Sequence, residues 1–217
     1  MWHIVIDMSG LPPEEVHIGL VLFNDNYKPS FLNEFYQEFA YLKSYHKKST
    51  HVDPDTLFKI LDFFDKKRLR MVCYNFKDFQ WKVHERRINE LFKEINPSHE
   101  YRDNYYRFYE KLLGILYYYS LQQISVDKGV YNVIACHESS IDIWEVFRTM
   151  LKLAKRDGFK IKPTANIRKI EHLLKMADYV AGASRKIDDF KVNTIERYTL
   201  LRDPIRDFDL KKIFNIW

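Results

Sequence analysis

The sequence predicts a single α/β domain over residues 1–217, built on a mixed five-stranded sheet flanked by helices. Three observations lead to this prediction. Two β-rich segments follow each other near the N-terminus across a short loop, which favours antiparallel pairing. Strands and helices alternate in the second half, as in parallel crossover units. No internal repeat or low-complexity tract divides the chain, so one domain is expected.

Five segments have the composition of strands. The first is closed by a Ser9-Gly10 turn, and the fourth is almost continuously apolar, as in a strand covered on both faces. The expected strands are residues 2–7, 18–23, 69–76, 130–136 and 159–161.

Helical periodicity and capping residues mark the helices. Asp53 followed by Pro54 is a strong helix start, and Gly158 is a typical helix end. Ser139 and Asp142 form a plausible capping pair. The expected helices cover residues 31–42, a stretch from Pro54, 80–95, 100–124, 140–156 and 166–186.

Two apolar features allow more than one interpretation. Tyr101, Tyr105 and Tyr109 are spaced four apart, a ladder that can stack bases but more often packs a helix into a core. The last thirty residues are too apolar for a loose tail. We expect them to pack on this domain or on a second copy of it, which would make a homo-oligomer.

The composition is that of a soluble globular protein, with 46% apolar and 30% charged residues. No apolar run approaches the length of a membrane span, and the N-terminus does not read as a secretory signal. Cys73 and Cys136 lie in apolar runs, which suggests buried free thiols in a reducing compartment. The cytoplasm is therefore the expected location, and a Cys-His zinc site is not expected.

The charge is mildly basic, with a net charge of +5 and an isoelectric point near 9.0. Residues 152–175 contain eight Lys or Arg, among them Arg168, Lys169 and Lys175, against the acids Asp157 and Glu171. This stretch is either a solvated face of two helices or a surface for nucleic acid, and the sequence favours neither.

Two motifs carry a resemblance to a known family. Residues 6–10 read Ile-Asp-Met-Ser-Gly, and residues 176–183 read Met-Ala-Asp-Tyr-Val-Ala-Gly-Ala. The chain resembles a large uncharacterised prokaryotic family whose members carry a first strand ending Asp-Glu-Ser-Gly and a late helix with an Ala-Asp motif. That family looks RNase H-like, and the order of elements here is similar over nearly the whole chain. Met8 stands where the family has Glu.

A closer likeness is to small archaeal exonucleases on the same fold. This likeness implies trimming of single-stranded DNA from the 3′ end. The Lys- and Tyr-rich composition is in keeping with an archaeal thermophile.

Three acids are the candidate catalytic residues and metal ligands: Asp7 after the first strand, Glu138 after the fourth, and Asp178 on the late helix. Phosphodiester hydrolysis is well served by Mg²⁺ or Mn²⁺ held by carboxylates from separate elements. Ala177, Ala181 and Gly182 would let the late helix approach the sheet closely.

Each acid also has a structural interpretation. Asp7 can be a turn acid, and Glu138 can stabilise the N-terminus of the following helix. Asp178 can form a salt bridge with Lys175 or Arg185.

The sequence therefore predicts a metal-dependent nuclease, with Ser9, Arg168, Lys169 and Lys175 binding nucleic acid, and single-stranded DNA is the expected substrate. The alternative is a nucleic-acid-binding or scaffold protein with a degraded site, for which Met8 and the displaced acid Glu138 argue.

Overall fold

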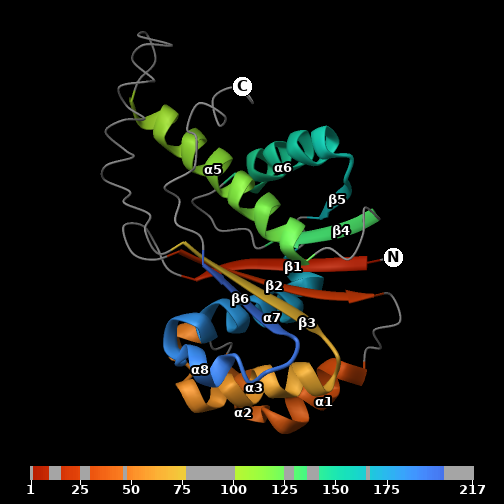
Figure 1. The fold of residues 1–217 in the computed structure, drawn as a ribbon, viewed down its shortest axis with the longest axis vertical. Helices are drawn as coiled ribbons and strands as arrows, with labels where there is room; N and C mark the ends of the chain where they lie inside the picture. Colours follow the sequence, from red (N-terminus) through yellow and green to blue (C-terminus); the bar gives the residue numbers. More distant parts are fainter. Residues whose placement is uncertain are drawn as a thin grey trace.

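A mixed six-stranded sheet in the order β5-β4-β1-β2-β3-β6 forms the centre of the protein. The computed structural model describes residues 2–9, 16–24, 30–45, 48–76, 101–124, 130–135, 142–164 and 167–202. Helices lie on both sides of the sheet (Figure 1). The strands are β1 Trp2–Ser9, β2 Val16–Asn24, β3 Arg70–Phe76, β4 Val130–Ala135, β5 Lys160–Thr164 and β6 Tyr198–Arg202.

The strand directions agree with the expectation for the β1–β2 pair and for the β4–β5 unit. The β2–β3 pair differs, because it is antiparallel although three helices lie between the two strands in sequence. β1 pairs with β2, and β2 with β3, in antiparallel fashion. β4 is parallel to both β1 and β5, and α6 (Ile143–Asp157) makes the crossover from β4 to β5. The sixth strand corrects the expected five: β6 joins the sheet parallel to β3, with Tyr198 opposite Met71 and Leu200 opposite Cys73. Part of the apolar C-terminal segment thus packs on this same domain.

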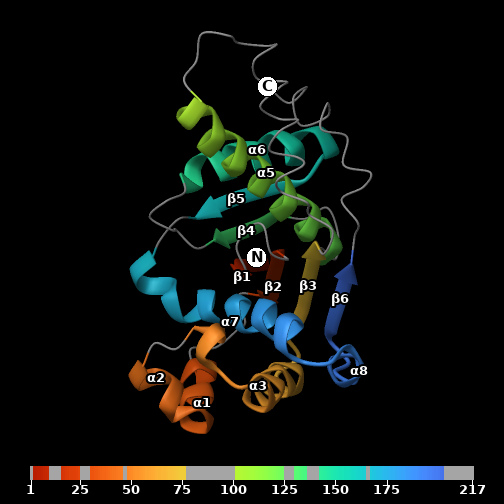
Figure 2. The same cartoon turned by 90° about the vertical axis from the view of Figure 1, so that its left-hand side faces the viewer.

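The helices form two layers (Figures 1 and 2). α5 and α6 cover one face of the sheet, and α7 lies against the other with α1, α2 and α3 beyond it. Their bounds are α1 Ser30–Glu38, α2 Ala40–Tyr45, the 3-10 turn η1 Ser49–His51, α3 Pro54–Lys66, α5 Tyr101–Ile124, α6 Ile143–Asp157, α7 Ile167–Lys186 and α8 Asp189–Val192. The helix expected over residues 31–42 is divided at Phe39, and the one expected over residues 80–95 lies outside the described residues.

Helix ends agree closely with the capping residues of the sequence. The Asp53 side chain accepts a hydrogen bond from the Thr56 amide at 2.9 Å, at the start of α3. Asp142 caps α6, which begins at Ile143 and not at residue 140. Gly158 ends α6 in the left-handed conformation with φ of 78°. Ser139 lies outside the described residues.

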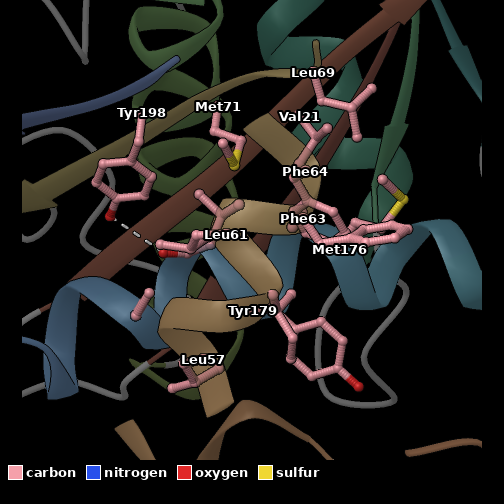
Figure 3. Close-up of a cluster of buried hydrophobic side chains, with 14 of the residues drawn as sticks. Val21, Leu57, Leu61, Phe63, Phe64, Leu69, Met71, Met176, Tyr179 and Tyr198 are labelled. Carbon is pink, nitrogen blue, oxygen red and sulfur yellow. Dashed lines mark hydrogen bonds between the residues drawn. The ribbon is translucent and has the colours of Figure 1, made fainter. Parts of the chain in front are cut away.

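The core has two parts because side chains alternate across each strand. On β1, Ile4 and Ile6 face α5 and α6, whereas Val5 belongs to the cluster on the α7 side. Figure 3 shows this second cluster, where Phe63 and Phe64 of α3 lie near Met176 of α7. Both faces of the sheet are thus covered at its centre.

Several sequence expectations can be placed on this framework. Cys73 is a buried free thiol, whereas Cys136 lies outside the described residues. The apolar pattern of α5 is core in its C-terminal half, where Leu113 and Leu116 are buried. The side chains of Tyr101, Tyr105 and Tyr109 lie outside the described residues. Within the described ranges, no helix is both long and apolar enough to span a bilayer.

Candidate functional site

Asp7 lies within β1, two residues before the strand ends at Ser9, and not at its end as the sequence suggested. Strand alternation places its side chain with Val5 on the face that α7 covers. The Asp7 side chain is half-buried, and its Oδ1 accepts a hydrogen bond from the Met8 amide at 2.8 Å. The carboxylate therefore points into the layer between the sheet and α7.

The backbone of α7 rests directly on the strand beside Asp7. Gly19 of β2 is the cross-strand partner of Asp7. A Cβ added at Gly19 would lie 2.1 Å from the carbonyl oxygen of Ala177 and 2.6 Å from the amide nitrogen of Ala181. The alanines thus allow the close approach that their size suggested. Asp178, the next residue after Ala177, lies on the same side of the sheet as Asp7.

Asp178 projects from the flank of α7 that faces η1. Met176 and Val180 belong to the apolar cluster, and at 100° per residue Asp178 lies on nearly the opposite flank from them. Its side chain is buried, with 9% exposure. Ser49 donates twice to it, from the backbone amide to Oδ2 at 2.7 Å and from Oγ to Oδ1 at 2.6 Å. The sequence allowed a salt bridge from Asp178 to Lys175 or Arg185, whereas the structure shows hydrogen bonds to Asp178 from Ser49.

Gly182 has a different role from the one expected, because it faces η1 and not the sheet. A Cβ added there would lie 2.3 Å from the Cβ of Ser49. One turn later, the Lys186 ammonium donates to the carbonyl oxygens of Ser49, Thr50 and Val52 at 2.9, 2.8 and 2.8 Å. Partial burial lowers the pKa of Lys186. Asp178, Gly182 and Lys186, four residues apart, therefore form one stripe that holds η1.

A row of buried polar residues lies next to Asp7 on the same face. Ser9, His17 and Asn75 are successive cross-strand partners on β1, β2 and β3, with 5%, 1% and 1% exposure. His17 Nδ1 is hydrogen-bonded to Ser184 Oγ at 2.5 Å. The carboxyl-terminal end of β1 is thus a polar region inside an otherwise apolar layer.

The Cys73 thiol belongs to this polar region. Its sulfur donates to Ser184 Oγ at 3.0 Å. Desolvation by burial raises the pKa of the thiol to about 12. The thiol is therefore protonated and packs as a small apolar group at neutral pH.

The other predicted site residues are placed only in part. Glu138 lies outside the described residues, as do the side chains of Arg168 and Lys169 in the first turn of α7. The Lys175 side chain is half-buried on the same helix. Among the residues that the structure describes, no group of three or more His, Cys, Asp or Glu side chains lies close enough together to hold a metal ion. Of the three predicted acids, the structure thus describes Asp7 and Asp178, both on the α7 side of the sheet.

Sequence reasoning missed Ser49, Lys186 and Gly19. Ser49 precedes the Asp53-Pro54 helix start in a short polar stretch that carries no motif. Gly19 interrupts an apolar strand, and a glycine inside a strand often marks a close backbone approach. That signal could have identified the crossing point of α7.

No family model matches the sequence, and no curated protein matches it. Among solved structures, the chain is similar to ribonuclease H2 from Pyrococcus horikoshii OT3, with a TM-score of 0.51 over 90% of this chain and 78% of that chain. The sequence identity is 13%. The chain has an RNase H-like fold.

This RNase H-like architecture confirms the fold class that the sequence predicted. The sheet order places β1 between β2 and β4, with β3 and β5 next to them. β6 is an addition outside β3, supplied by the C-terminal extension. The likeness concerns the fold, and the motif family and the exonuclease activity remain predictions.

Proposed function

We propose that the protein is a metal-dependent phosphodiester hydrolase that acts on nucleic acid. The proposal is carried by one observation: two carboxylates from β1 and α7 lie on the same side of the sheet, beside the point where α7 rests on Gly19. Such positions are typical of functional acids.

The donor chemistry of this pair fits Mg²⁺ or Mn²⁺. Each oxygen of Asp178 accepts one hydrogen bond from Ser49, and a carboxylate offers about four acceptor positions in all. Each oxygen therefore keeps a lone pair for a cation. Mg²⁺ is commonly held by one or two carboxylates and several waters, so the two carboxylates of Asp7 and Asp178 would be enough in number. Glu138, which follows β4 in sequence, would be a third.

A bound cation and the residues of the chain would make different contributions to hydrolysis. A divalent cation at this site supplies Lewis acidity toward the phosphate and a more acidic water. Asp7 and Asp178 hold their charges at fixed positions on a strand and a helix, next to the buried polar residues at the end of β1. The positive charges of Arg168, Lys169 and Lys175 would bind the nucleic acid backbone. Ser9, for which the sequence predicts the same role, is buried with 5% exposure and does not present its hydroxyl to a ligand.

Within this activity, we propose more specifically that the protein degrades single-stranded DNA from the 3′ end. It is supported by the resemblance of residues 6–10 and 176–183 to the exonuclease-like family and by the net charge of +5. A nuclease assay tests this assignment. The protein is incubated with Mn²⁺ and with end-labelled single-stranded DNA, double-stranded DNA or RNA, and the products are analysed. We expect mononucleotide release from the 3′ end of single-stranded DNA, and none in the presence of a chelator.

The matched variants are Asp7→Asn and Asp62→Asn. Asp62 lies on exposed α3 surface in an ion pair with Lys66, so its substitution should leave hydrolysis unchanged. Asp7→Asn should lower hydrolysis by at least about 100-fold while the folded structure persists. Full activity of Asp7→Asn would reject the assignment.

The alternative, a binding or scaffold protein with a degraded site, is favoured by Met8 and by the engagement of both Asp178 oxygens with Ser49. Calorimetric titration with Mn²⁺ separates the two functions. A degraded site gives no heat of binding, although the protein could still bind single-stranded DNA.

A further inference from the structure

We infer that Ser49 is a positioning residue for the metal-binding carboxylate of Asp178, an inference that rests on the proposed function. The Ser49 side chain is completely buried, and its two donors reach different oxygens of Asp178, at 2.7 and 2.6 Å. One hydrogen bond leaves a carboxylate free to swing about that contact. Two bonds to two oxygens fix its plane as well as its position.

Ser49 is itself held against the helix that carries Asp178. Lys186 binds three carbonyl oxygens of the chain around η1, including that of Ser49. Gly182 lies between Asp178 and Lys186 on the helix and leaves room for the Ser49 side chain, whose Cβ would be 2.3 Å from a Cβ at residue 182. Asp178 and Lys186 both belong to α7 and both bind Ser49. The helix therefore holds Ser49 at a fixed distance from Asp178.

The charges of Asp178 and Lys186 are also placed so that they stabilise the turn η1. The negative carboxylate of Asp178 meets an amide donor at the start of η1, and the positive Lys186 meets carbonyl oxygens of the turn and its exit. η1 therefore stays in place without help from a bound cation. Asp178 would therefore already be oriented when a cation binds, and the lone pairs that Ser49 does not use would be available for coordination.

Hydrogen-bonding partners of metal ligands commonly change metal affinity by about 10- to 100-fold when they are removed. Ser49→Ala removes the hydroxyl donor and keeps the backbone amide, so the carboxylate regains rotational freedom. We expect the Kd for Mn²⁺, measured by calorimetry on the full chain, to rise by about 10-fold or more.

Tyr118→Phe is the matched control. Tyr118 also donates a buried hydroxyl to a carboxylate, that of Asp157, at 2.8 Å, but it lies in the cluster on the α5 and α6 side of the sheet. Both variants lose one hydroxyl and should show similar decreases in Tm. Tyr118→Phe should keep the Mn²⁺ Kd within about 2-fold of the unmodified protein.

The outcomes are distinct. A raised Mn²⁺ Kd in Ser49→Ala alone supports the positioning role. Equal Mn²⁺ affinities in Ser49→Ala and the unmodified protein, or equal losses in both variants, would overturn it and leave the proposed function standing. If the unmodified protein binds no Mn²⁺, the proposed function fails, and the role of Ser49 fails with it.

Discussion

Gly19 of β2 lies directly against the backbone of Ala177 in α7: a Cβ at Gly19 would lie 2.1 Å from the Ala177 carbonyl oxygen. The contact fixes how α7 crosses β2, next to the cross-strand partner Asp7. Because the opposing atoms belong to the helix backbone, no side-chain rotation can relieve a clash there. The placement of Asp178 relative to Asp7 depends on this contact.

Gly19→Ala should therefore destabilise the protein by about 3 kcal/mol or more, since overpacking against backbone forces α7 away from the sheet. Chemical denaturation measures the free energy of unfolding. Gly158→Ala is the matched control: its φ is 78° but no atom lies within 4 Å of an added Cβ, so only the left-handed conformation is penalised, by about 1 kcal/mol. Equal losses in the two variants would contradict the close contact.

Substitutions of Asp178 should separate folding from metal binding. In Asp178→Asn the amide can accept from the Ser49 backbone and donate to its hydroxyl, so two neutral hydrogen bonds replace two charged ones. We expect a loss of about 1 kcal/mol in stability. Asp178→Ala leaves the buried Ser49 donors unpaired and should cost about 3 kcal/mol.

The Asp178→Asn protein should nevertheless lose Mn²⁺ binding, because the charge is gone. Chemical denaturation measures the loss of stability in each variant, and calorimetry on the same samples measures Mn²⁺ binding. An Asn variant as unstable as the Ala variant would argue against the hydrogen-bond exchange with Ser49.

The thiol of Cys73 should make stability fall at high pH. Its pKa rises from 9.0 to about 12 in the folded protein, mainly by desolvation. Between these values the unfolded chain has released the proton and the folded chain has not. The folded state therefore binds more protons, and the free energy of unfolding decreases by about 1.4 kcal/mol per pH unit.

Cys73→Ala should remove this contribution from the pH dependence between about pH 9 and pH 12. Denaturation curves at several pH values in the two proteins give the difference directly. Parallel slopes would show that the thiol is not desolvated as described.

The cap of α3 should give the opposite pH dependence. A hydrogen bond from the Thr56 backbone lowers the pKa of Asp53 below its ordinary 3.8. The ionised cap therefore stabilises the protein above about pH 4, and its contribution is lost as the pH falls through the lowered folded pKa. Asp53→Ala should cost about 1 kcal/mol at pH 7 and much less at pH 2.

Asp53→Asn is the informative control, because Asn caps helices well but does not titrate in this range. Its stability at pH 7 should be close to that of the unmodified protein. Thermal melts at pH 7 and pH 2 distinguish the three proteins, and a pH-independent cost of Asp53→Ala would rule out the charged cap.

The sequence by itself determined the elements whose signals are local. Asp53 and Gly158 mark helix boundaries through contacts with residues a few positions away, and the apolar runs of β1 to β4 identify strands for the same reason. The placement of Asp7 on the first strand and Asp178 on the late helix was also readable, because strand and helix patterns fix which residues belong to each element.

Tertiary structure alone decided how these elements meet. The hydrogen bonds between Ser49 and Asp178 span 129 positions in sequence, and β6 becomes a strand only because β3 offers an edge with which to pair. Gly19 acquires its role only when a helix backbone rests on it. Such contacts result from the joint packing of several elements, so no short window of sequence contains the information that specifies them.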